Sequence, residues 1–304
     1  MLVVLTNGWV ETDRVRYQRN AVRKIECGLE IVNEIIDYKS CLIEYQKIDD
    51  DGFTIDGELD DEIENFKIDQ NKEVGFLPEK IAEILPRLTR YVARDCAIKH
   101  VNEKHFEKLH ELEDLNLNEN EIDSIAGDSF KDLKKLKVLS LSGNRLRLIN
   151  PKWFETMKKL QKFSVNSNQV KHLHEGTFGK LTNLHQIDLS YNKLSSLEKN
   201  LFNNNSKLQD IKLNNNNLEI IPSTTFDRLN RIKFVALEQN VCVNQHYGND
   251  PNCNGSQNVF DVIQMKKFLM WNCTRLLVTN ESHRPSQLNI LILIKLLAIL
   301  RALS

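Results

Sequence analysis

The chain has little glycine, proline and cysteine, with 11, 6 and 6 residues of each among 304. So few glycines and prolines exclude a collagen-like fold, and six cysteines in so long a chain exclude a small domain held together mainly by disulfides. There is also no surplus of charge, because 41 Lys and Arg residues face 42 Asp and Glu residues, for a formal net charge of -1. This balance argues against a general nucleic-acid binder.

What the sequence does contain is a period of 24 residues. An apolar residue recurs at this spacing at Leu88, Leu112, Leu136, Leu160, Leu184, Leu208 and Ile232. Around these positions the residues follow the pattern LxxLxLxxN, whose last position is Asn120, Asn144, Asn168, Asn192, Asn216 and Asn240. The alternation within Leu115–Asn116–Leu117 indicates a short strand. A buried asparagine can bind backbone groups that are left unpaired where such a strand ends.

This pattern resembles the leucine-rich-repeat family, and the 24-residue coil with its phenylalanine is similar to the coils of Toll-like and Slit-like ectodomains. The resemblance implies a solenoid with a curved parallel β-sheet on its concave face and short turns or 3-10 segments on its convex face. The asparagines are expected to form a ladder from coil to coil. A second inner column is expected from Phe106, Phe130, Phe154, Phe178, Phe202 and Phe226. No coil can bury its core alone, so both ends need caps.

We expect five segments along the chain. Residues 1–22 are an unstructured N-terminus or the remnant of a lost signal peptide, and residues 23–62 form an N-terminal cap. Residues 63–241 are the repeats, with one degenerate coil and about seven regular coils from Leu88 onward. Residues 242–280 form a cysteine-containing C-terminal cap, and residues 281–304 are an apolar tail.

The resemblance implies that the cysteines at the two ends form disulfides, as in the caps of extracellular members of the family. The expected pairs are Cys27–Cys41 in the N-terminal cap and Cys242–Cys273 in the C-terminal cap. Cys253 then either stays a free thiol or displaces the Cys242–Cys273 pairing. Cys96 replaces asparagine in the first regular coil, where a small buried thiol fits.

Several features favour a location outside the cell. Asn-x-Ser/Thr sequons occur at Asn204, Asn254, Asn272 and Asn280, which are candidate glycosylation sites. The first residues form only a short apolar stretch, without the long apolar run of a signal peptide. We interpret this as a misassigned start; the alternative is a protein that is not secreted. The apolar residues 288–303 are fewer than the ~20 needed to span a bilayer and include Lys295 and Arg301. Membrane association through them is therefore possible but not favoured.

A partner is expected to bind the concave sheet, where the third, fifth and seventh positions of each coil point outward. Arginine and aromatic side chains are frequent binding hot spots. The candidate contacts, with one on the adjoining rim, are Arg90, Arg94, Lys162, Lys212, Phe234 and Tyr191. Asp188 and Lys212 occupy equal positions on adjacent strands, so they are expected to pair with each other. Lysines between Lys134 and Lys162 form a basic rim that could attract a sulfated polysaccharide or an acidic partner, although a solvated edge is the simpler interpretation.

The sequence contains no catalytic motif, metal-ligand spacing or cofactor motif, so no enzyme activity, metal or cofactor is predicted. The nearest set of catalytic residue types is Asp188, His185 and either Ser164 or Ser190. The predicted function is a non-enzymatic extracellular module that binds a protein or glycan partner. The alternative is a cell-surface receptor or co-receptor ectodomain, including an innate-immune one, that is attached through the C-terminal tail.

Overall fold

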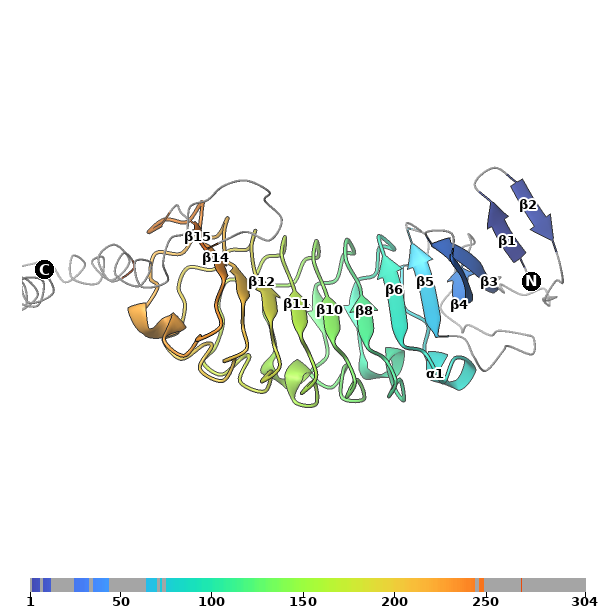
Figure 1. The fold of residues 1–304 in the computed structure, drawn as a ribbon, viewed down its shortest axis with the longest axis horizontal. Coiled ribbons are helices and arrows are strands. Elements are labelled where there is room, and N and C mark those ends of the chain that lie inside the picture. The colour runs from blue at the N-terminus through green and yellow to red at the C-terminus, as the bar shows by residue number, and fades with distance from the viewer. Residues whose placement is uncertain are drawn as a thin grey trace, which may run out of the picture.

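The computed structural model describes residues 2–5, 8–11, 25–32, 35–43, 64–69, 72, 75–243, 246–248 and 269. Its central feature is a curved row of short strands, one from each coil of a solenoid (Figure 1). The solenoid architecture predicted from the 24-residue period is therefore confirmed. The parallel sheet lines one face, and turns with short helices line the other.

The repeat strands pair in parallel with the register that the period predicts. Leu139, for example, pairs with Leu115 in the preceding coil and with Phe163 in the next, each 24 residues away. The strands of the row are β4 (Ile35–Ile43), β5 (Asn65–Asp69), β6 (Arg90–Arg94), β8 (Asp114–Asn116), β10 (Val138–Ser140), β11 (Lys162–Ser164), β12 (Gln186–Asp188), β13 (Asp210–Lys212) and β14 (Phe234–Ala236).

Additional strands extend the sheet at both ends. At the N-terminal end, β3 (Ile25–Val32) pairs antiparallel with β4, and the Cys27 and Cys41 backbones lie opposite each other. At the C-terminal end, β15 (His246–Gly248) pairs antiparallel with β14. Antiparallel end strands differ from the repeat strands, which is what capping segments require.

Two short strands are described within the first eleven residues. The structure contains β1 (Leu2–Leu5) and β2 (Gly8–Glu11), which pair antiparallel, and β1 also pairs with β3. The apolar and β-branched residues of these two segments have strand propensity, which accounts for the pairing.

The opposite face is built from turns and very short elements, as predicted. It carries a small parallel pair, β7 (His100–Val101) with β9 (Ser124–Ile125). The short helices are α1 (Ile81–Ile84) and the 3-10 segments η1 (Glu103–His105), η2 (Pro151–Phe154) and η3 (Ser223–Phe226). Asn102 and Asn150 cap η1 and η2 through side-chain oxygens that accept from the backbone N–H two residues later.

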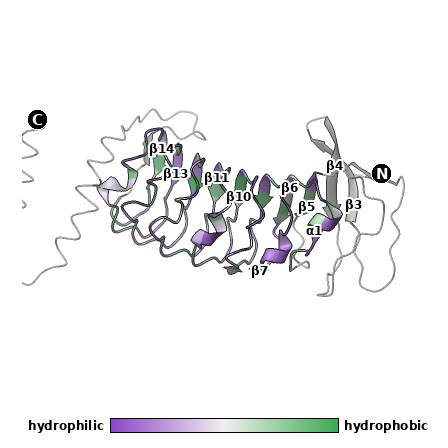
Figure 2. Ribbon diagram, turned by 90° about the horizontal axis from the view of Figure 1, so that it is seen from below, coloured by the Kyte–Doolittle hydropathy of each residue, from purple (hydrophilic) through white to green (hydrophobic). Residues whose placement is uncertain are grey.

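Between the two faces lies one continuous apolar core. The hydropathy-coloured view shows apolar residues recurring along the strands of successive coils (Figure 2). The phenylalanines at the 24-residue period are all fully buried, as expected. Phe178 and Phe202 stack nearly parallel with ring centroids 5.9 Å apart, while the buried Trp153 inserts beside Phe130 and Phe154.

The asparagine ladder is present in six coils with one repeated set of hydrogen bonds. Asn168 is typical: its Nδ2 donates to the carbonyls of Leu141 and Val165 at 2.9 and 3.0 Å. Its Oδ1 accepts from the Leu146 N–H at 2.9 Å. Leu141 and Leu146 belong to the preceding coil, so each asparagine both closes its own strand exit and binds its neighbour. These bonds pair buried backbone groups that would otherwise lack partners.

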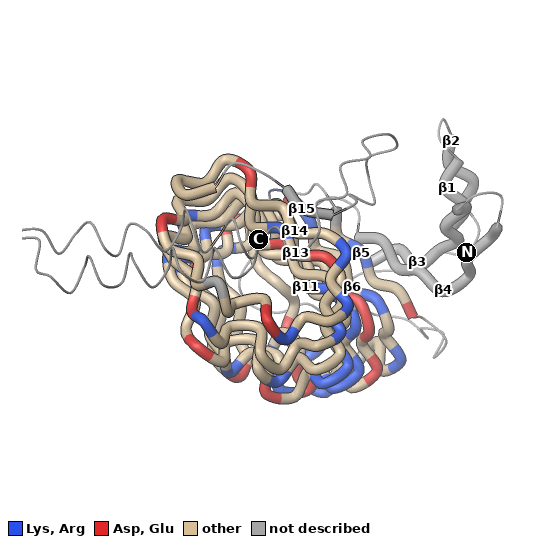
Figure 3. The backbone as a smooth tube through the Cα atoms, turned by 60° about the vertical axis from the view of Figure 1, so that its left-hand side comes forward, with Lys and Arg blue, Asp and Glu red and all other residues tan. Residues whose placement is uncertain are grey.

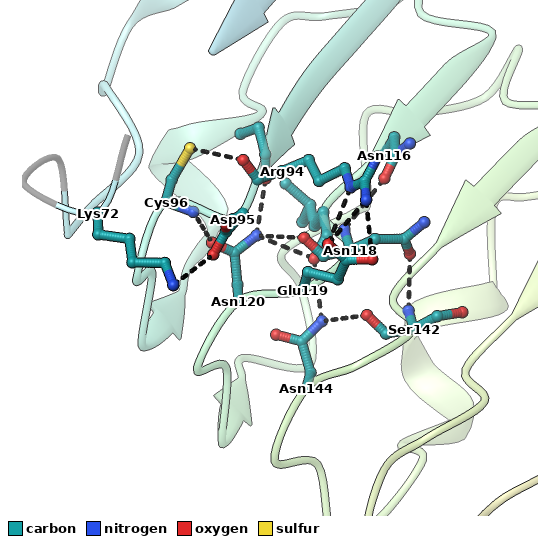
Figure 4. A network of polar contacts seen from close by, with 12 residues as sticks. Lys72, Arg94, Asp95, Cys96, Asn116, Asn118, Glu119, Asn120, Ser142 and Asn144 are labelled. Carbon is teal, nitrogen blue, oxygen red and sulfur yellow. Dashed lines mark hydrogen bonds and ion pairs between the residues drawn. The ribbon is translucent and has the colours of Figure 1, made fainter. Parts of the chain in front are cut away.

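The ladder changes character at Cys96, which occupies the asparagine position of the first regular coil. Its Sγ lies 3.1 Å from the Arg94 carbonyl oxygen and 3.6 Å from that of Ile68. These contacts replace the stronger amide bonds of the other coils, because a thiol is a weak donor. Figure 4 shows Cys96 next to Asn120, whose Oδ1 accepts from the Cys96 N–H.

The residue before each ladder position has a left-handed backbone. Positive φ values occur at this position in seven coils, at Asp95, Glu119, Gly143, Ser167, Tyr191, Asn215 and Gln239. This conformation turns the chain out of the strand while its N–H still binds the next coil, as with Tyr191 N to the Asn214 carbonyl at 3.0 Å. Gly adopts this conformation without a steric penalty, and Asn with a smaller penalty than most other residues.

Four consecutive asparagines, 214–217, allow the ladder to be tested within one stretch of chain. Asn216 is buried and bonds two coils, whereas Asn217 is exposed. Each buried backbone group left unpaired costs about 1–3 kcal/mol. We therefore expect Asn216→Ala to lower the free energy of unfolding by at least about 2 kcal/mol, and Asn217→Ala by less than about 0.5 kcal/mol. Urea unfolding followed by circular dichroism measures both, and equal losses would contradict the assigned role.

Candidate functional site

The concave surface is formed by the outward positions of β6, β8 and β10–β14. Because the strand backbones are already paired on both sides, only side chains remain to contact a partner there. The outward residues of β10 and β11 are partly or fully exposed.

The centre of the concave surface is small, polar and internally ordered. The Ser142 and Ser164 hydroxyls are 2.7 Å apart, and Ser164 also donates to Asn166 Oδ1 at 2.9 Å. Asn118 Oδ1 accepts from the Ser142 N–H at 2.7 Å, a contact drawn in Figure 4. Adjacent coils are thus linked through their side chains, which fixes donors and acceptors in a single arrangement before any partner arrives.

Both arginines predicted as contacts are already paired within the chain. Arg90 Nε lies 3.4 Å from Asp114 Oδ2 on the next strand. Arg94 binds Glu119 through two nitrogens, with contacts of 2.8–3.1 Å (Figure 4). Both remain candidate contacts, but each would have to leave or share its carboxylate to bind a partner. Arg90 and Asp114 hold equal positions in adjacent coils, so the period itself carries the signal that could have predicted this pair.

Lys212 behaves as its equal position with Asp188 predicts. Its Nζ lies 3.8 Å from Asp188 Oδ2, and the side chains are only partly exposed. Asp188 Oδ1 also accepts from the Ser190 hydroxyl at 2.6 Å. Lys212 is thus engaged with its own chain and contributes less to a partner than a free cation would.

Phe234 does not lie open on the concave surface as predicted. Its side chain is 3 % exposed, and it is outside the main apolar core. Phe234 lies on the last repeat strand, at the end of the solenoid, where β15 extends the sheet and Gly248 pairs opposite it. Burying a large aromatic side chain at this end is favourable, and it removes Phe234 from the contacts available to a partner.

Lys162 and Tyr191 are the predicted contacts that remain available. Lys162 is exposed on β11, and its ammonium group has no ion pair among the residues that the structure describes. Tyr191 is 56 % exposed, and its position on the rim of the sheet has a positive φ of 53°. A bulky side chain is unusual in this backbone conformation.

Of the residues considered for catalysis, Asp188 and Ser190 are hydrogen-bonded to each other, but His185 joins neither of them through Nδ1. His185 Nδ1 is buried without a hydrogen-bond partner, while Asp188 is occupied by Ser190 and Lys212. Within the described ranges, no three His, Cys, Asp or Glu side chains gather as metal ligands. The same ranges hold no helix with the length and apolar character to cross a membrane.

Several predicted residues cannot be placed. Cys253, Cys273, the sequons at Asn254, Asn272 and Asn280, and residues 288–303 lie outside the described residues. Asn204 is described and exposed, with Nδ2 3.3 Å from the Gly179 carbonyl oxygen. Cys242 is described at the end of the last coil, but Cys273, its predicted disulfide partner, lies outside the described residues.

The carboxyl of Asp114, on the concave surface, makes the stability of the folded chain depend on pH. Burial raises the pKa of its carboxyl, although Arg90 acts in the opposite direction. A raised pKa means that the folded chain holds the proton more tightly than the unfolded chain. This contribution to stability is present below the unfolded pKa of about 4 and is lost as the pH rises through the folded value.

We therefore expect Asp114→Asn to become more stable relative to the wild type as the pH is raised from about 3 to about 7. Urea unfolding of both proteins at a series of pH values measures this difference. A difference that falls with rising pH would mean that Arg90 outweighs burial.

Comparisons with known proteins agree with this geometry. The family model described as the BspA type leucine rich repeat region matches residues 99–233 in six copies. Among solved structures, the Drosophila Toll–Spatzle complex in its glycosylated form matches with a TM-score of 0.54 and 23% identity, over 59% of this chain and 24% of that chain. The TLR13–ssRNA13 complex matches with a TM-score of 0.48 and 23% identity, over 58% of this chain and 29% of that one.

The chain therefore spans less than a third of either solved chain. No curated protein matches the sequence. At this level of identity the solved structures show the fold alone. The sequence period, the ladder geometry and the repeat model together identify the described coils as leucine-rich repeats stacked into a solenoid.

Proposed function

We propose that the chain is a non-enzymatic recognition module that binds a protein or glycan partner through its concave surface, outside the cell. The observation that carries this proposal is the hydrogen-bonded row of small polar side chains across adjacent coils. Preorganised donors and acceptors reduce the ordering cost of binding. A partner contacting several coils at once would meet this row as one rigid surface.

The polar row supplies specificity, and the available large side chains supply anchors. Lys162 and Tyr191 are both exposed. Arg90, Arg94 and Lys212 can contribute only by exchanging a carboxylate of this chain for one of the partner. The two arginine pairs lie at the surface, where ion pairs typically contribute less than about 1 kcal/mol, so the exchange costs little for them, whereas Lys212 and Asp188 are only partly exposed.

An extracellular location is supported by the ends of the solenoid. The backbones of Cys27 and Cys41 lie opposite each other in the antiparallel β3–β4 pair. Directly opposed residues in such a pair have Cα atoms about 4.5–5.5 Å apart, within the range that a disulfide bridges. The exposed sequon at Asn204 is consistent with the same compartment.

Binding through the concave surface is tested by placing a large side chain where the native side chains are small. Ser140 lies on β10 in the middle of the sheet and makes no side-chain hydrogen bond among the described residues. Ser140→Tyr therefore adds bulk without breaking the polar row. We expect binding to partners found in an array of extracellular proteins and glycans to weaken at least about tenfold, or 1.4 kcal/mol.

The control is His172→Tyr, which adds a similar ring at an exposed position on the turns of the opposite face. Biolayer interferometry with the full chain compares the two variants with the wild type. Partners that lose affinity equally with both variants, or only with His172→Tyr, would place binding away from the concave surface.

The compartment is tested at the one sequon that the structure describes. Asn204 is exposed, whereas the adjacent Asn205 is buried and donates to the Phe178 and Leu181 carbonyls at 2.9 Å. We expect the chain expressed in animal cells to carry a glycan at Asn204, and Ser206→Ala to remove that glycan alone. Intact mass before and after glycosidase treatment measures this, with Ser195→Ala as the control outside any sequon. Unmodified chain in the cytosol with all thiols reduced would overturn the extracellular location.

A further inference from the structure

Cations concentrate at the edge of the sheet where the chain enters the strands β10 and β11. Four lysines there are exposed, and no ion pair with them occurs among the described residues. They are Lys134, Lys158, Lys159 and Lys162, and the name basic rim is used below for these four residues alone. Figure 3 looks more nearly along the solenoid axis, and blue Lys and Arg positions of neighbouring coils lie close together along the lower edge of the tube.

The stacking of coils sets the spacing of these charges. Lys134 and Lys158 hold equal positions in adjacent coils, so their backbones are about 4.8 Å apart. Lys159 follows Lys158 directly, and Lys135, at its equal position in the preceding coil, is outside the basic rim. The basic rim therefore presents Lys134 and Lys158 as one short row, with Lys159 and Lys162 close by in the same coil as Lys158.

The basic rim has a defined boundary on its N-terminal side. Glu111 and Glu113 of the preceding coil neutralise Lys135 and Lys137, with N–O distances of 2.6 Å in both pairs. The hydrogen bond from Lys135 lowers the pKa of Glu111, and Lys159 adds to the same effect.

The surroundings of the basic rim restrict the chemistry of a ligand. Among the described residues the large apolar side chains that are exposed are Leu148, Tyr191 and Val241, and all three lie on coil segments after the strand. The basic rim therefore lacks the apolar and aromatic anchors of a protein interface. It also lacks the aromatic platforms on which single-stranded nucleic-acid bases stack. A ligand rich in anionic groups and hydroxyls, without apolar surface, fits it best.

We propose that the basic rim binds a linear sulfated polysaccharide, with successive sulfate groups paired to the ammonium groups of adjacent coils. Each ammonium offers three donors and suits a compact anion without demanding bidentate geometry. The exposed Gln161 lies between Lys159 and Lys162 and can bond sugar hydroxyls. Lys162 stands where the basic rim meets the concave surface, so a bound polysaccharide would border the proposed partner site without filling it.

The experiment measures binding of the full chain to heparin, with fully desulfated heparin and neutral dextran as ligand controls. The variant is Lys134→Gln, Lys158→Gln, Lys159→Gln and Lys162→Gln combined. The matched control changes four other exposed lysines to Gln, namely Lys99, Lys171, Lys193 and Lys199, which follow the strands of their coils. Both variants alter the net charge equally, so a difference between them reports position.

We expect the rim variant to lose at least about tenfold in heparin affinity and the matched control less than about twofold. By analogy with counterion release from nucleic acids, the rim variant should also show a slope of log affinity against log salt that is shallower by about 3. Thermal unfolding confirms that each variant is folded. The double variant Lys158→Gln, Lys159→Gln serves in place of the fourfold one if that protein is unstable, with a smaller loss in the same direction.

Equal losses in the rim variant and the matched control would overturn the proposal, as would equal binding to heparin and desulfated heparin. Tighter binding to poly-L-glutamate or to polyuridylate than to heparin would also overturn it, in favour of an acidic protein or a nucleic acid. Ser140→Tyr is expected to leave heparin binding unchanged. Failure of the concave proposal and failure of this one are therefore distinguishable.

Discussion

The structure depends on how backbone polar groups are paired where each strand ends. A coil of this size leaves carbonyls and an N–H inside the solenoid, and burying each of them unpaired would cost about 1–3 kcal/mol. The inward asparagine resolves this by donating to its own coil and to the preceding one, and by accepting from the latter. Because the bonds run between coils, no coil is stable without its neighbours.

The same stacking governs the surface. Side chains at equal positions of adjacent coils always meet, so charge pairs form in columns along the solenoid. Arg90 with Asp114 and Asp188 with Lys212 are two such pairs. Glu111, Lys135 and Lys159 hold equal positions in three successive coils, and Lys135 pairs with Glu111 while Lys159 has no ion pair among the described residues. The order of acidic and basic residues along such a column therefore decides which lysines are left to bind a ligand.

Much of the fold could be predicted from the sequence because the period is exact over six coils. The strand register, the phenylalanine column and the roles of Asn216 and its equivalents all follow from position within the repeat. The candidate site was less predictable, since it depends on what neighbours do. Arg94 is held by Glu119 because the residue before the ladder turns left-handed and brings its side chain alongside. Phe234 is buried on the last repeat strand. The segment that follows does not repeat, so its contacts with Phe234 could not be predicted from the 24-residue period.

The thiol at Cys96 changes how one coil boundary is held together. Six coil boundaries carry an asparagine amide that bonds both sides. At the boundary preceding Cys96, the Sγ lies 3.6 Å from the Ile68 carbonyl oxygen, and its closer contact of 3.1 Å, to Arg94, stays within its own coil. The backbone pairing is longer there, because β5 and β6 pair over five residues and successive regular strands such as β10 and β11 over three. The degenerate coil is thus joined to the regular coils by a longer stretch of strand pairing, beside a thiol in place of the amide.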